Sequence, residues 1–96
     1  MKLEDIEKIS RPFKVNLGGI SDQTQQMAVD LLWSDPTASE DMMGMHPNTV
    51  RDPLKLNNIM CYGPDQVEKF LKVNQLSMII RSHQNCMDGI DHFASR

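Results

Sequence analysis

The stretch from residue 63 to residue 80 constrains the fold most, because it predicts a helix followed directly by a buried strand. Pro64 favours a helix start, since the ring of proline is already shaped for the first helical turn. Apolar side chains at Val67, Phe70 and Leu71 are spaced to form one buried stripe along that helix. The helix should therefore pack on one face and leave its charged face in solvent.

The predicted strand follows at residues 76–80, LSMII, an apolar run of the kind found in buried strands. Asn74 can adopt the left-handed conformation that ends a helix. The run stops just before His83, and ligands of open α/β sheets gather beyond the carboxyl ends of strands. His83 is therefore a candidate for a metal or phosphate site, and an ordinary hydrogen-bonded loop histidine is the alternative.

The remainder of the chain predicts one more helix, one short apolar segment and two loops. Residues 3–10 have helical periodicity, and Pro12 would end that helix. Residues 27–33 are apolar enough to be buried as either a short helix or a strand. Residues 13–26, with two glycines and several glutamines, and residues 37–58, with little periodicity, are predicted to be loops.

Charge and hydropathy exclude several classes of partner. The chain has 10 Lys and Arg against 13 Asp and Glu, without a block of like charge, which argues against a nucleic-acid partner. Its apolar runs are too short to span a membrane, and its start has no secretory pattern, so we expect an intracellular protein without a membrane partner. Cys61 and Cys86 lack metal-site or redox spacing, and we expect both to be reduced thiols.

The length of 96 residues allows at most one domain with a small core. The sequence has three Phe, one Tyr and one Trp, whereas its eight Met are flexible and specify shape poorly. We therefore expect marginal stability and a benefit from packing against a partner surface.

Local spacing supplies no complete catalytic or metal site. His46 and His92 lie in polar surroundings typical of surface residues. A lone histidine binds a divalent ion weakly, and no second histidine or cysteine stands at ligand spacing. A triad of Ser82, His83 and Asp88 could be drawn, but almost any chain contains such a set, so we do not favour it.

A seven-residue segment, residues 30–36 with the sequence DLLWSDP, resembles the signature of the phosphoprotein phosphatase family, which includes the type-one and type-two-A phosphatases and calcineurin. Further segments resemble family blocks in family order: 6–12 (IEKISRP), 62–71 (YGPDQVEKFL), 74–76 (NQL), 79–84 (IIRSHQ) and 88–89 (DG). Residues 13–26 have no counterpart in the family. The resemblance therefore covers nearly the whole chain.

Two further segments indicate a branch of this family. Residues 44–51 (GMHPNTVR) and 86–94 (CMDGIDHFA) are most similar to the Kelch-repeat-bearing phosphatases of plants and protists. The resemblance implies an α+β fold, the four-layer α/β/β/α arrangement of calcineurin-like phosphoesterases. Residues 1–96 would be a partial catalytic domain, with outer helices and one or two strands of the sandwich.

The resemblance also implies roles for three residues. His83 matches the histidine of the family's Arg-Ala/Ser-His motif, a ligand of its centre of two divalent ions of the Mn, Fe or Zn type. Arg51 matches an arginine that binds the substrate phosphate, for which a planar fork of donors is well suited. Asp35 belongs to a block near that centre.

Three neighbouring residues carry more specific expectations. Trp33 should pack beneath the centre as a core residue. Asp52 stands where the family has glycine, and it could draw the guanidinium of Arg51 away as an ion pair. Arg81, next to the predicted strand, should have a structural role.

Four family blocks that supply the other metal ligands and the general acid are absent from the sequence: Gly-Asp-x-His, Gly-Asp-x-Val-Asp-Arg-Gly, Gly-Asn-His-Glu and His-Gly-Gly. We therefore expect no complete catalytic set and no metal bound by this chain alone. Two hypotheses remain open. The chain is a piece of a phosphatase that acts on phosphoprotein substrates together with the rest of its domain, or it is a non-catalytic interaction or structural module packed on a larger partner.

Overall fold

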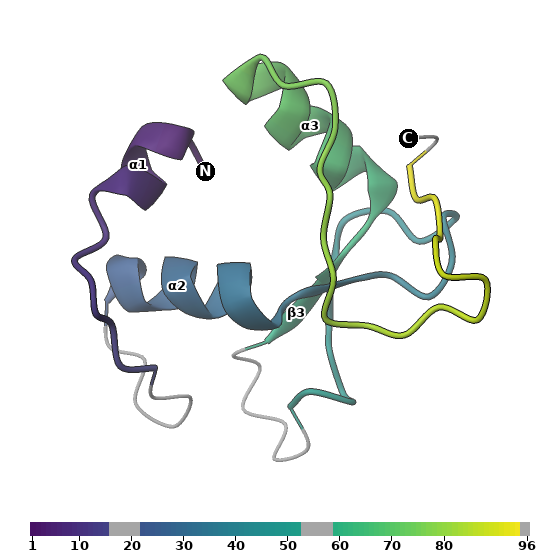
Figure 1. Ribbon diagram of the computed structural model, residues 1–96, viewed down its shortest axis with the longest axis horizontal. Helices are drawn as coiled ribbons and strands as arrows, with labels where there is room; N and C mark the ends of the chain where they lie inside the picture. Colours follow the sequence, from purple (N-terminus) through teal and green to yellow (C-terminus); the bar gives the residue numbers. More distant parts are fainter. Residues whose placement is uncertain (16–21, 53–58, 95–96) are drawn as a thin grey trace.

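The computed structural model describes residues 1–15, 22–52 and 59–94, and it combines helices with a small sheet (Figure 1). The elements in chain order are α1 (Leu3–Glu7), α2 (Gln23–Trp33), β1 (Asp35–Pro36), β2 (Met45–Pro47), β3 (Met60–Tyr62) and α3 (Pro64–Asn74). None of the helices in the described part is long and apolar enough to cross a membrane. Mixed helix and sheet content agrees with the predicted α+β class.

The sheet has three strands in the order β1-β3-β2, where one or two strands were expected. β1 runs parallel to β3, with Asp35 opposite Cys61, and β2 runs antiparallel to β3, with His46 opposite Cys61. β2 lies inside the segment predicted as one long loop at 37–58, so that prediction is wrong at Met45–Pro47. Residues 53–58 of that segment lie outside the described residues. Because β1 and β3 are parallel, α2 enters at one end of this pair and α3 leaves from the other end.

α2 resolves the ambiguity of residues 27–33, which belong to a helix. The helix begins earlier than expected because the side chain of Asp22 accepts a hydrogen bond from the backbone N–H of Gln25 at 2.8 Å, which caps the first turn. The loop predicted at 13–26 is therefore wrong from Gln23 onward, and residues 16–21 lie outside the described part. The buried side chains of α2 are Ala28 and Val29.

α3 confirms the predicted helix and its start at Pro64. Val67 and Leu71 are buried, and they pack with Ala94 near the end of the described chain. The left-handed residue is Gln75, with φ of 55°, and not Asn74 as predicted. Asn74 lies in the last turn of α3, and its side-chain oxygen accepts a hydrogen bond from the N–H of Leu3 at 2.9 Å. This contact links α1 to the end of α3.

The loop before β2 is fixed to the start of α3. Asp65 accepts a hydrogen bond from the N–H of Gly44 at 2.8 Å, and the N–H of Gly63 donates to the carbonyl of Gly44 at 2.8 Å. A side chain at position 63 would overlap the carbonyl oxygen of Met42, so this close approach requires glycine. The hydrogen bond from Gly44 lowers the pKa of Asp65 below its ordinary value.

The strand predicted at residues 76–80 is absent, and this expectation is wrong for the described structure. The segment follows α3 without regular structure, and Leu76, Met78, Ile79 and Ile80 are all exposed. In Figure 1 it descends in light green from the end of α3 as an irregular tube without a strand arrow. A strand requires a neighbour to satisfy its backbone groups, and no strand of the described residues pairs with this segment.

We predict that Leu71→Ala destabilises the chain by roughly 2 to 5 kcal/mol, because it removes a buried side chain and leaves a cavity. Leu71 is 2% exposed, whereas Val73 on the same helix is 50% exposed and provides the matched control Val73→Ala. Urea unfolding followed by circular dichroism measures both. Equal losses for the two variants would contradict the proposed packing of α3.

Candidate active site

The centre of the candidate site is the carboxylate of Asp35, the first residue of β1, which is 4% exposed. Its Oδ2 accepts hydrogen bonds from Arg51 Nε at 3.0 Å and from Asn48 Nδ2 at 2.9 Å. Its Oδ1 accepts one from Arg81 Nη2 at 3.0 Å. The sheet positions these groups, because Asp35 lies in β1 while Asn48 directly follows β2.

The surroundings of Asp35 keep it ionised. Burial alone would raise its pKa, but hydrogen bonds from Arg51 and Asn48, with the positive charges of Arg51 and Arg81, hold the pKa below the ordinary value of 3.8. The two ion pairs therefore compensate the cost of removing this carboxylate from water.

Arg51 joins Asp35 to the segment that carries His83. Its backbone N–H donates to Asn48 Oδ1 at 3.0 Å, which fixes the turn after β2. Its Nη2 donates to the carbonyl oxygen of His83 at 2.8 Å. The ion pair described for Arg51 is with Asp35, whereas the sequence suggested one with Asp52. Arg51 and His83 therefore lie together, as the predicted site requires.

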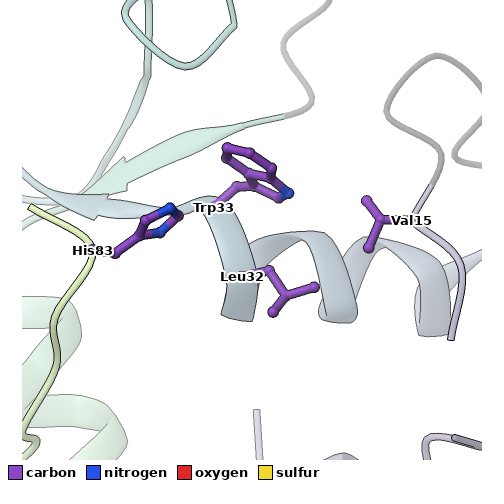
Figure 2. A pocket seen from close by; sticks show the side chains of 4 residues that line it. All are labelled: Val15, Leu32, Trp33 and His83. Atoms are coloured by element: carbon purple, nitrogen blue, oxygen red, sulfur yellow. The ribbon is translucent and has the colours of Figure 1, made fainter. Parts of the chain in front are cut away.

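His83 and Trp33 line an open pocket of about 370 Å³ together with Val15 and Leu32 (Figure 2). The rings of Trp33 and His83 have centroids 5.5 Å apart and planes tilted by 55°. The guanidinium carbon of Arg51 lies 5.9 Å from the centroid of the Trp33 ring, within cation–π range. Trp33 is half-buried, and its ring contacts both His83 and Arg51.

The other candidate residues lie as follows. Arg81 pairs with Asp35, in agreement with a structural role. His46 is half-buried in β2, with Nε2 2.7 Å from the carbonyl oxygen of Met43, so it is less exposed than expected, whereas His92 is exposed. Sequence reasoning missed Asn48, because a single asparagine after a proline has no motif to distinguish it.

The two cysteines are free thiols, as expected. Cys61 is half-buried in β3, where burial, together with the negative charge of Asp35, raises its pKa. Cys86 is exposed. Neither Cys61 nor Cys86 therefore forms a disulfide.

A metal centre requires several ligand side chains close together. Within residues 1–15, 22–52 and 59–94, no group of three or more His, Cys, Asp or Glu side chains could hold a metal ion. His83 contributes one imidazole, and the nearby carboxylate of Asp35 is already bonded to two arginines. The described residues therefore do not by themselves fit a two-metal centre.

Comparison with known proteins identifies the class. The chain belongs to the calcineurin-like phosphoesterase family, whose sequence profile matches residues 1–87. It is 39% identical over 92 residues to serine/threonine-protein phosphatase BSL2 of Arabidopsis thaliana, a match that covers 96% of this chain and 8% of that protein. This relative is a plant Ser/Thr phosphatase, so the predicted resemblance to plant members of the family is confirmed.

A second relative extends the comparison to animals. Serine/threonine-protein phosphatase with EF-hands 1 of Mus musculus is 40% identical over 81 residues, which cover 83% of this chain and 11% of that protein. The chain thus spans about a tenth of the length of these curated relatives. No solved structure has a significant match to it. The resemblance to protein Ser/Thr phosphatases inferred from DLLWSDP is confirmed.

The lowered pKa of Asp35 predicts acid sensitivity. A carboxylate with a depressed folded-state pKa contributes stability that is fully present above its unfolded pKa and is lost as the pH falls through the folded value. We expect this contribution to disappear below the ordinary pKa of 3.8. Urea unfolding between pH 7 and pH 2 should show a steeper acid loss in the wild type than in Asp35→Asn, with the exposed Asp41→Asn as control. Parallel curves for the wild type and Asp35→Asn would contradict the assignment.

Proposed function

We propose that this chain is a segment of a metal-dependent protein Ser/Thr phosphatase that hydrolyses phosphoserine and phosphothreonine in phosphoprotein substrates, and that it is inactive in isolation. One observation carries the proposal: Asp35, Arg51 and His83 lie together, joined by bonds of Arg51 to the other two. These residues come from separate segments of the chain. They are the three that the family resemblance assigns to the surroundings of the catalytic centre.

Arg51 would bind the phosphate of the substrate. Its Nε and Nη2 are engaged with Asp35 and with the carbonyl of His83, and within the described residues no hydrogen bond involves Nη1. The side chain is 22% exposed, so solvent or an oxyanion can reach it. A guanidinium held at two of its nitrogens presents its remaining donors in a fixed direction, which suits a tetrahedral phosphate.

His83 would supply one metal ligand within the complete domain, and the other ligands would come from residues that the described chain does not contain. Within that complete domain, a two-metal centre would supply Lewis-acid chemistry at the phosphate. In this chain, the imidazole contacts the tilted ring of Trp33 and lines the pocket.

The isolated chain should have no phosphatase activity. We expect turnover of p-nitrophenyl phosphate and of a phosphothreonine peptide, each with added Mn²⁺, to equal the protein-free background, since one imidazole cannot hold two ions. His83→Ala should be indistinguishable from the wild type in this assay. Turnover above background that disappears in His83→Ala would overturn the proposed inactivity and establish a working centre.

The exposed segment at residues 76–80 favours a second candidate function, a non-catalytic interaction or structural module packed on a larger protein. Four of its five side chains are apolar and exposed, and its backbone has no strand partner among the described residues. Such a segment can pair with another chain or with the rest of a domain. An intracellular location and the exclusion of nucleic-acid partners stay predictions from the sequence.

If residues 76–80 pair with a second copy of this chain, Ile80→Asp should weaken that self-association. Ile80 is 89% exposed, and burial of such a side chain against a second chain contributes about 1.5 to 3 kcal/mol, which corresponds to roughly tenfold or more in the association constant. Sedimentation velocity over a concentration series measures the change. Val50 is 85% exposed in a different loop, so Val50→Asp is the control. If both variants weakened association equally, residues 76–80 would not be the contact.

A further inference from the structure

The backbone at His83 has an unusual conformation. Its φ is 81°, in the left-handed region that side-chain-bearing residues rarely adopt. Residues persist in such conformations only when their surroundings hold them there. The segment around His83 has no regular structure and is mostly exposed, so backbone pairing within a helix or strand does not hold it.

Besides the ring of Trp33, the side chain of Arg51 contacts His83, and Arg51 is in turn bonded to Asp35. Arg51 Nη2 donates to the carbonyl oxygen of His83 at 2.8 Å, and Arg51 Nε is bonded to Asp35 at 3.0 Å. A second contact precedes the histidine, where Arg81 Nη2 donates to the other oxygen of Asp35. Each oxygen of one buried carboxylate is therefore connected to the segment that carries His83, one through Arg51 and the other through Arg81.

We propose that Asp35 is a positioning residue that acts through Arg51 to hold the left-handed backbone of His83 and, with it, the imidazole against Trp33. This positioning role is inferred from contacts within the chain. Its relevance to metal binding by His83 rests on the proposed phosphatase function.

The carboxylate suits this role better than a neutral amide of the same shape. Ionised Asp35 accepts hydrogen bonds at both oxygens, one facing each arginine. An asparagine would present an oxygen to one arginine and an NH₂ group to the other, which cannot accept a hydrogen bond. Asp35→Asn therefore tests the charge and the second acceptor with little change of volume.

Nuclear magnetic resonance of the whole 96-residue chain tests the proposal. A residue with positive φ has a short distance between its own amide and α protons, which gives a strong intraresidue Overhauser effect. The chain has one Trp and three His, so contacts between the Trp33 indole and the His83 ring can be assigned individually. We expect both signals in the wild type and the loss of both in Asp35→Asn and in Arg51→Gln.

Asp65→Asn is the matched control, because it removes a carboxylate that fixes a loop to α3 without any described contact to His83. It should retain both signals. The proposal is overturned if the wild type lacks them, if folded Asp35→Asn or Arg51→Gln keeps them, or if Asp65→Asn loses them equally. Should Asp35→Asn fail to fold, as judged by circular dichroism, Arg51→Gln decides the outcome. Because no readout depends on turnover, a failure here is distinct from a failure of the phosphatase proposal.

Discussion

The arrangement of the candidate site depends on one buried negative charge. Asp35 can be ionised in a largely dry position only because two guanidinium groups and one amide compensate it. Those three partners belong to the turn after β2 and to the segment after α3, so the electrostatic requirement of a single carboxylate fixes the relative placement of otherwise irregular segments. Removing one partner from such a group leaves an uncompensated charge, which is strongly destabilising.

The parts of the fold that local sequence determines were predictable. α3 begins at a proline and buries a stripe with helical spacing, and both signals are contained within eleven residues. The start of α2 was missed because it depends on the capping side chain of Asp22, which stands in a stretch whose composition is typical of a loop. The apolar run at 76–80 predicts a strand, but a strand forms only beside a neighbour, and its own residues cannot provide that neighbour.

The candidate site was predictable only in part, for a related reason. A family resemblance pointed to Asp35, Arg51 and His83, and the structure brings them together. Their mutual bonds did not follow from the sequence, because Arg51 had two acidic residues available and local proximity favoured Asp52. The sheet register decides such choices, since it determines which loop ends meet. The role of Asn48 likewise depends on the turn after β2.

The separation of these contacts along the chain has a consequence for synthesis on the ribosome. Arg51 lies 16 residues after Asp35, and Arg81 lies 46 residues after it. Asp35 is therefore translated well before Arg81. Until Arg81 has been translated, the carboxylate is either solvated or paired with Arg51 alone. Closing loops of this length before the contacts form also costs entropy. The cluster around Asp35 therefore cannot be completed until Arg81 has been translated.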